Sequence, residues 1–255
     1  MADGASRGRL HVGTSGWSYR SWHGDFYPAD LKRADELAYL SRRLGAAEIN
    51  ASFYRLQRAS TYARWREQTP PDHVFALKGS RYVTHLKRLR EPAPHLERLV
   101  ASGIEELGPK LDVLLWQLPA ALAFDREVLR TFVTQLTAGP TGRWRHAIEP
   151  RHNSFGSEEA VEVLTAAGVA TVWSDGAGKW PAIERDTAGF RYVRLHGHPE
   201  LYASRYAGRT LDAWAQRCRE WMDRGQDVHV YFDNDMRGHA PHDAERLRAK
   251  VLGED

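Results

Sequence analysis

Charged and imidazole side chains stand where the apolar, strand-like runs of this chain end. Residues 48–50, 78, 117, 149–152, 175, 194–196 and 233–235 carry them. Burying charge inside a strand is costly, so such side chains are favoured where strand ends meet at one working surface. In a parallel α/β barrel all strands end on the same face, which holds the active site. The pattern therefore predicts one polar site built from strand ends.

Three cations in this set predict an anion-binding pocket. The guanidinium groups of Arg151 and Arg194 match a carboxylate or phosphate with paired hydrogen bonds, and Lys78 adds a point charge. Further residues near the strand ends are expected to help bind the substrate: Asn50, Tyr54, Trp17, His85 and His152. The alternative is a structural network in which acidic residues neutralise the cations, with Glu48, Glu149, Asp175 and Asp233 as its members.

Two acids and a histidine predict acid–base chemistry. Glu149 and Asp233 follow different strands and could act as a general acid and base pair. His196 changes charge near neutral pH and is the expected proton shuttle between them. Because side chains two apart share a face of a strand, Arg194 and His196 are expected to point the same way.

A metal site is the alternative use of the same acids. Zinc or manganese could be bound by a subset of Glu48, Glu149, Asp175, His196, His198 and Asp233. The chain has no His-Glu-x-x-His motif and no paired cysteines, and the lysine and arginines would compete for the carboxylates. We therefore predict neither a metal nor a cofactor, with a divalent metal as the alternative.

Aromatic and basic residues near the strand ends suggest a nucleic-acid ligand as a further alternative. Tyr202 and Tyr206 alternate with Arg205 and Arg209, and a basic stretch follows the third strand at residues 81–90. Aromatic rings stack on bases, and arginines and lysines bind phosphates. The same aromatics could instead pack loops, and the basic stretch could be a solvated surface.

The elements that position these residues alternate between strands and helices. Strands are predicted at residues 10–14, 46–50, 74–78, 111–117, 146–149, 169–173, 190–196 and 228–232. Helices are predicted at 34–44, around Tyr62, at 92–107, after Asp125, from Ser157 to Gly168, around Cys218 and around Leu247. This order predicts an α/β fold, a single (β/α)8 TIM-type barrel over residues 10–255, after a flexible N-terminal lead at 1–9.

The bulk composition is that of an ordinary globular protein. The 255 residues are 42% hydrophobic and 27% charged, with a net charge of +3. One cysteine, Cys218, suits a reducing compartment, and no stretch is apolar enough for a membrane span or signal peptide. We expect a cytoplasmic protein without membrane association, whose oligomeric state the sequence leaves open.

Short motifs from residue 10 to residue 247 resemble those of a known family. They include Gly13-Thr14-Ser15-Gly16-Trp17-Ser18-Tyr19, Ser52-Phe53-Tyr54-Arg55, Glu149-Pro150-Arg151-His152, Tyr192-Val193-Arg194-Leu195-His196-Gly197 and Tyr231-Phe232-Asp233-Asn234. In these blocks the chain is similar to the domain of unknown function 72 family, the YecE-like proteins. The resemblance implies a TIM-type barrel and leaves the activity unassigned.

Together the residues predict an enzyme whose substrate is an anionic small molecule, expected to be phosphorylated. Hydrolysis or isomerisation of a phosphorylated sugar or nucleotide, by metal-free acid–base chemistry, fits the groups at the strand ends. A nucleic-acid-binding protein and a metal-dependent phosphodiesterase of the endonuclease type are the alternatives.

Overall fold

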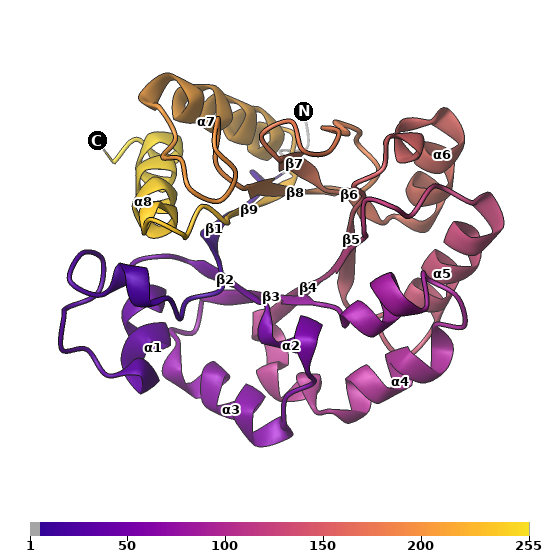
Figure 1. Cartoon of the computed structure of the whole chain (residues 1–255), viewed down its shortest axis with the longest axis horizontal. Coiled ribbons are helices and arrows are strands. Elements are labelled where there is room, and N and C mark those ends of the chain that lie inside the picture. The colour runs from indigo at the N-terminus through magenta and orange to yellow at the C-terminus, as the bar shows by residue number, and fades with distance from the viewer. Residues whose placement is uncertain (1–5, 255) are drawn as a thin grey trace.

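The fold is a barrel of parallel strands ringed by helices (Figure 1). The computed structural model describes residues 6–254. The strands are β1 (Leu10–Ser15), β2 (Ala46–Ile49), β3 (Val74–Lys78), β4 (Leu111–Gln117), β5 (Arg145–Glu149), β6 (Ala170–Thr171), β7 (Trp173–Asp175), β8 (Phe190–Leu195) and β9 (Asp227–Phe232). Their order in the sheet is β6-β5-β4-β3-β2-β1-β9-β8-β7, and every pair is parallel. The predicted barrel is confirmed.

The sixth predicted strand is divided into two short ones. β6 pairs with β5, and β7 pairs with β8, so the chain itself closes the barrel between them. Val172 lies at the junction, and its backbone N–H donates to the carbonyl of Ile148 at 2.8 Å. The nine strands therefore correspond to the eight that the sequence predicts.

Helices cover the outside of the barrel, and most follow the predicted order. They are α1 (Glu36–Ser41), α2 (Ala51–Tyr54), α3 (Ala59–Gln68), α4 (Ala93–Ala101), α5 (Arg126–Ala138), α6 (Glu158–Ala167), α7 (Gly208–Asp223) and α8 (His239–Leu252). The predicted helix at 92–107 is wrong in its second half, because Gly103 has a φ of 93° and a 3₁₀ segment, Ile104–Lys110, follows it. Between β7 and β8, residues 176–189 form a loop rather than a helix.

Polar side chains cap the first turns of two helices. The side chain of Asp125 accepts a hydrogen bond from the backbone N–H of Val128, and that of Ser157 accepts one from Ala160. Gly168 ends α6 with a φ of 63°, a conformation that favours glycine.

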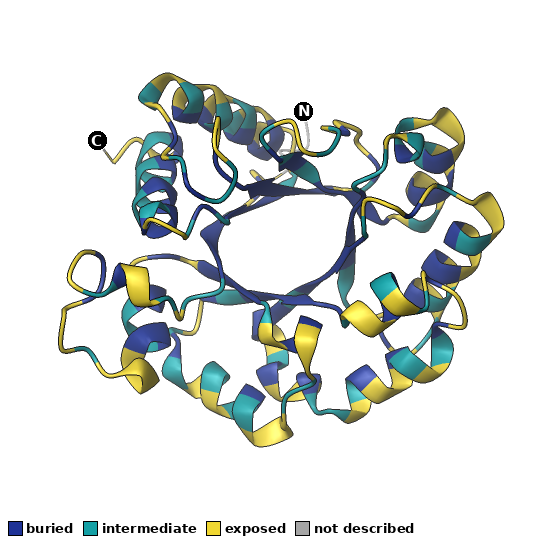
Figure 2. Ribbon diagram, viewed as in Figure 1, coloured by how far each residue is buried: buried dark blue, intermediate teal, exposed yellow. Residues whose placement is uncertain are grey.

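The middle of the barrel interior is lined by small residues facing large ones. Ala46, Ala76 and Ala147 point inward together with Tyr192 and Tyr231. This arrangement leaves room for long side chains that cross the barrel above them. The second, larger core lies between the outer face of the strands and the helices, and Figure 2 shows buried residues on the inner side of each helix.

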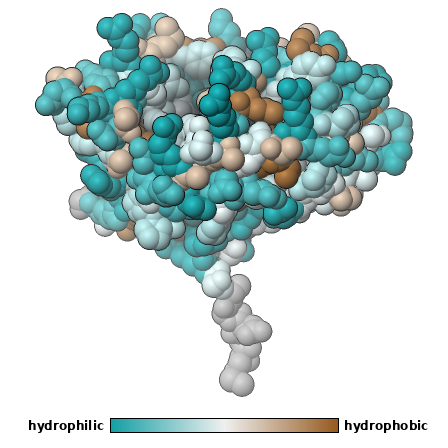
Figure 3. Space-filling view, turned by 90° about the horizontal axis from the view of Figure 1, so that it is seen from below, coloured by the Kyte–Doolittle hydropathy of each residue, from teal (hydrophilic) through white to brown (hydrophobic). Residues whose placement is uncertain are grey.

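One face of the molecule is seen in space-filling form in Figure 3. The side seen in Figure 3 is mostly hydrophilic, with hydrophobic residues in scattered patches. Among the described residues no helix is long and apolar enough to cross a membrane.

Part of the predicted N-terminal lead contacts the barrel. Residues 1–5 lie outside the described residues. Gly8 donates its N–H to the carbonyl of Met222 at 2.8 Å, and the N–H of Arg9 donates to Asp227 Oδ1 at 2.8 Å.

Candidate active site at the barrel mouth

A cavity opens where the strands end, and we call it the barrel mouth. It has a volume of about 500 Å³. It is lined by Tyr19, Asn50, Phe53, Tyr54, Lys78, Gln117, Arg151, Arg194, Tyr202, Asp233, Asp235 and Met236. Six of the predicted site residues (Asn50, Tyr54, Lys78, Arg151, Arg194 and Asp233) are in this lining, so the strand ends do meet as the sequence predicts.

Arg194 occupies the centre of the floor of the barrel mouth. Its Nη1 donates to Glu149 Oε2 at 2.7 Å, and its Nη2 lies 2.8 Å from Glu48 Oε1 and 3.1 Å from Asp233 Oδ2. Only 1% of its side chain is exposed. A buried cation with three carboxylate partners has little capacity left for a substrate anion. Arg194 therefore belongs to the structural network that the sequence offered as the alternative.

Glu149, His196 and Asp233 form a continuous polar chain. His196 Nε2 lies 3.1 Å from Glu149 Oε1, and His196 Nδ1 lies 2.9 Å from Asp233 Oδ2. Burial opposes ionisation of Glu149, but Arg151 and Arg194 hold its pKa well below the usual value. Asp233 is 16% exposed; desolvation opposes its ionisation as well, yet Arg194 and His196 lower its pKa to about 2. Both acids are thus ionised at neutral pH, and Asp233 reaches the cavity.

Lys78 is a buried residue that lines the barrel mouth, and its ammonium has no protein partner. It is 8% exposed, the same as Lys110. The ammonium of Lys110 donates to the carbonyls of Arg66 and Thr69 at 2.7 Å. None of the described residues forms a hydrogen bond or ion pair with Lys78 Nζ, which lies 4.4 Å from the centre of the Phe53 ring. Burial and the charge of Arg194 lower the pKa of Lys78 to about 8.

Arg151 keeps part of its hydrogen-bonding capacity. Its Nη2 donates to Glu149 Oε1 at 3.2 Å, and its Nε is buried without a partner among the described residues. The guanidinium stacks on Trp180, 3.8 Å from the ring centre. Trp180 comes from the loop between β7 and β8, and its indole N–H donates to Ser174 Oγ at 2.9 Å. The sequence analysis missed this residue, because nothing in its spacing ties it to a strand end.

The side of the barrel mouth near β3 carries a positive field. Burial and three cations, Arg81, Lys78 and Arg151, lower the pKa of His85. His85 itself hydrogen-bonds to Thr84 at 2.8 Å and packs edge-on against Phe53. An anion entering the cavity would meet its most favourable potential on this side.

The opposite side of the barrel mouth is acidic. Asp235 lines the cavity near Asp233, and burial together with the charge of Asp233 raises the pKa of Asp235 to about 6. Tyr19 lies beside Asp235, where burial and the two aspartates raise the pKa of its hydroxyl. From the sequence, Asp235 was placed at a strand end without a role of its own, although its position two residues after Asp233 could have indicated a second acid.

Four predicted substrate-binding residues remain, and two of them, Trp17 and His152, do not line the cavity. Trp17 packs edge-on against Trp65, with ring centres 5.2 Å apart, and does not line the cavity. His152 accepts a hydrogen bond from the N–H of Ser154 and so caps a 3₁₀ turn. Asn50 and Tyr54 do line the cavity; Asn50 donates to Ser15 Oγ at 2.9 Å, and Tyr54 is 73% exposed.

Much of the basic stretch after β3 is engaged in local contacts. Lys87 pairs with Glu91 at 3.0 Å, Arg88 donates to the carbonyl of Ala121 at 2.8 Å, and Arg90 lies 3.7 Å from Asp125. These contacts favour the solvated-surface interpretation of this stretch over a nucleic-acid interface.

The carboxylates at the barrel mouth already surround a cation. The guanidinium of Arg194 lies among Glu48, Glu149 and Asp233, where a metal bound by these acids would have to lie. A metal at this position would have to displace a fully buried arginine, which disfavours these residues as ligands.

Comparison with known proteins identifies the family. The family model described as "Protein of unknown function DUF72" matches residues 11–254. The chain belongs to the DUF72 family. A DUF72 family protein from Thermotoga maritima is similar in structure, with a TM-score of 0.81 and 28% identity over 97% of this chain and 100% of that one.

Other DUF72 relatives support the same assignment. The UPF0759 protein YunF from Bacillus subtilis is 25% identical over 270 residues, covering 93% of each chain. A DUF72 family protein from Enterococcus faecalis has a TM-score of 0.78 at 16% identity, covering 95% of each chain, and so shares the fold. The DUF72 family has no activity in its description, so function has to be argued from the site.

Proposed function

We propose that this DUF72 protein is an enzyme that binds a small anionic, phosphorylated substrate at the barrel mouth and acts on it by acid–base chemistry. The observation that carries the proposal is the ammonium of Lys78, which has no protein partner and belongs to a largely buried side chain that lines the barrel mouth. Burying an ammonium without a partner is costly, and Lys110 illustrates the usual solution of pairing with carbonyls. A substrate phosphate would provide the missing partner, with Arg151 as the second cation.

Proton transfer would take place on the acidic side of the cavity. Asp233 is ionised and exposed to the cavity, which suits a general base, and His196 links it to Glu149. Asp235, with a pKa of about 6, could hold or release a proton near neutral pH. Cations on one side and acids on the other would suit isomerisation or hydrolysis of a phosphorylated sugar or nucleotide.

Arg194 takes a different role in this proposal from the one that the sequence predicts. Its contacts with Glu48, Glu149 and Asp233 favour a positioning role, in which it fixes the acids instead of binding the phosphate. Exposed Tyr54 and Met236 at the rim would contact the part of the substrate that carries no charge. The proposal retains a cytoplasmic location, because the single Cys218 is a free thiol.

Thermal stabilisation by phosphorylated sugars and nucleotides tests the binding step. A binding ligand is expected to raise the melting temperature of wild type and of Arg90→Gln, a control in the exposed basic stretch, but not of Lys78→Met or Arg151→Gln. Lys78→Met should fold, since an apolar side chain replaces an unpaired buried charge. Equal stabilisation of Lys78→Met and wild type would refute the pocket.

Turnover of the stabilising ligand tests the chemistry. Asp233→Asn is expected to keep binding and to lose about 10²–10⁴-fold in turnover. Unchanged turnover would remove Asp233 from the mechanism. If only oligonucleotides bind, with an affinity that falls steeply with salt, the nucleic-acid alternative replaces the proposal.

A further inference from the structure

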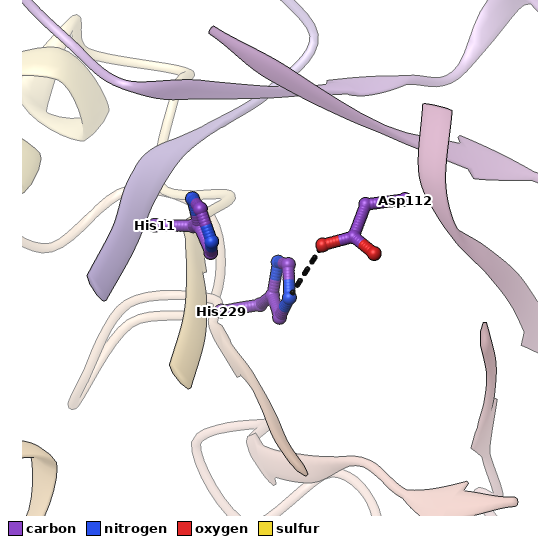
Figure 4. Close-up of side chains that lie close together, drawn as sticks. All are labelled: His11, Asp112 and His229. Carbon is purple, nitrogen blue, oxygen red and sulfur yellow. Dashed lines mark ion pairs between the residues drawn. The ribbon is translucent and has the colours of Figure 1, made fainter. Parts of the chain in front are cut away.

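Three side chains with metal-binding groups meet inside the barrel, at the end opposite the barrel mouth. His11 comes from the start of β1, Asp112 from the start of β4 and His229 from the first half of β9 (Figure 4). One ligand atom from each lies within 4.8 Å of the other two. This His-Asp-His cluster (His11, Asp112 and His229) is separate from the residues that line the cavity at the barrel mouth.

The imidazoles of the cluster are buried with unsatisfied nitrogens. His229 is 0% exposed; its Nδ1 has no partner among the described residues, and the single polar contact of its Nε2 is with the Asp112 carboxylate. His11 is 7% exposed, and its Nε2 also has no partner among them. Two buried nitrogens, His11 Nε2 and His229 Nδ1, are thus left without a partner, at a cost of about 1–3 kcal/mol each unless something binds there.

A break in strand register turns Asp112 toward the two histidines. In the β3–β4 pair, Phe75 is opposite Leu111 but Ala76 is opposite Val113, so Asp112 is an extra residue. Val113 and Leu115 point into the barrel, and strict alternation would direct Asp112 outward. Instead its Oδ2 lies 3.3 Å from His229 Nε2. Figure 4 draws this contact as a dashed line and shows the carboxylate facing the imidazole. Bulges that redirect a side chain are common next to functional sites.

We propose that His11, His229 and Asp112 bind a divalent transition-metal ion. Two imidazoles and a carboxylate form a ligand set typical of zinc, and water would complete the coordination. The ligand atoms would have to move together by roughly 1.5 Å to reach the separation of about 3.3 Å in a tetrahedral zinc site.

Arg145 leaves the metal-facing oxygen of Asp112 free. It lies 3.5 Å from the other oxygen, Oδ1, and its shorter contact is 2.8 Å to Asp227. The arginine therefore orients the carboxylate from behind, as outer hydrogen-bonding partners of metal ligands do.

The position of the cluster indicates a structural role for the metal. Residues at the amino-terminal end of barrel strands usually serve stability, whereas chemistry lies at the other end. The ion would tie β1, β4 and β9 together across the interior. This proposal is independent of the substrate and mechanism proposed for the barrel mouth.

Zinc reloading tests the site. The purified full-length protein is stripped with a chelator and titrated with zinc, and bound zinc and melting temperature are measured. We expect one zinc ion per chain and a rise in melting temperature of roughly 5–10 °C at a hundredfold excess over Kd. His229→Gln and Asp112→Asn should abolish both effects. His73→Gln is the matched control, because His73 is 1% exposed and has an unpartnered Nε2, but it belongs to no group of three or more potential metal ligands among the described residues.

A zinc-soaked crystal of wild type locates the ion without any variant. An anomalous difference peak among His11, Asp112 and His229 is the expected result, and it decides the matter if His229→Gln fails to fold. Absence of stoichiometric zinc binding, zinc binding by His229→Gln equal to that of wild type, or a peak at Asp233 and His196 would each overturn the proposal.

Discussion

Arg194 Nη1 donates to Glu149 Oε2 at 2.7 Å across the barrel, and neither side chain is more than 1% exposed. The two residues come from β8 and β5, which do not pair in the sheet. Because both groups are shielded from water, the Arg194 guanidinium fixes the Glu149 carboxylate in one orientation. Glu149 in turn contacts His196. The geometry of the acid–base chain thus depends on a residue that does not itself transfer a proton.

Removing the Arg194 side-chain charge is expected to destabilise the fold strongly. Arg194→Met leaves Glu48, Glu149 and Asp233 without their shared cation, and breaking a buried pair in this way costs about 3–5 kcal/mol. Urea unfolding measures the loss. The control is Arg185→Met, whose exposed pair with Glu158 should contribute less than about 1 kcal/mol. Equal unfolding free energies for Arg194→Met and wild type would contradict the central role of Arg194.

Asp235 is expected to make the protein less stable as pH rises from about 4 to 6. Its pKa is raised to about 6 in the folded protein, from 3.8. The folded state therefore binds this proton more tightly than the unfolded state, and that advantage is lost as pH rises through the folded pKa. Asp235→Asn should be about 1–3 kcal/mol more stable than wild type at pH 7 and close to it at pH 4.

The measurement for Asp235 is urea unfolding of wild type and variant at the two pH values. Asp72→Asn, the same substitution at an exposed position, is the control. A wild-type protein that gains stability relative to Asp235→Asn between pH 4 and 6 would show that the pKa is lowered rather than raised.

The sequence was sufficient to predict the barrel and the meeting point of its strand ends. Hydrophobic runs, caps such as Asp125 and stop signals such as Gly168 are local, and they fixed the order of the elements. The division of the sixth strand at Val172 and the helix break at Gly103 were missed, because apolar periodicity alone does not show where pairing changes or where a backbone takes a positive φ.

The charge balance of the site could not be predicted, since it depends on contacts across the barrel. Glu48 and Arg194 are 146 positions apart in the sequence and become partners only when the barrel closes. The unpartnered ammonium of Lys78 could not be predicted either. Lys78 and Lys110 are the same residue type, and only the groups around them in the folded protein differ. The sequence also did not show that Asp112 points into the barrel. Predictions of side-chain direction assume strict alternation along a strand, and the bulge in β4 breaks that alternation.

Cys218 is expected to react with thiol reagents only when the protein unfolds. It is 0% exposed, and burial raises its pKa to about 12, so almost no thiolate is present at neutral pH. Labelling with a chromogenic disulfide should be negligible for the native protein, and complete in denaturant. The urea dependence of labelling should coincide with loss of tryptophan fluorescence, and labelling well before that transition would show that α7 opens separately.

The affinity of the barrel mouth for a phosphorylated ligand is expected to fall at alkaline pH. The Lys78 ammonium, with a pKa of about 8, loses its proton as pH rises, and the neutral amine attracts an anion much less. Affinity should fall on the order of tenfold between pH 7 and 9, in proportion to the charged fraction of Lys78. Lys78→Arg is the matched variant, since a guanidinium stays charged throughout this range. Calorimetric titration of both proteins with one phosphorylated ligand measures the effect, and a wild-type affinity that stays constant from pH 7 to 9 would exclude Lys78 as the residue that binds the anion.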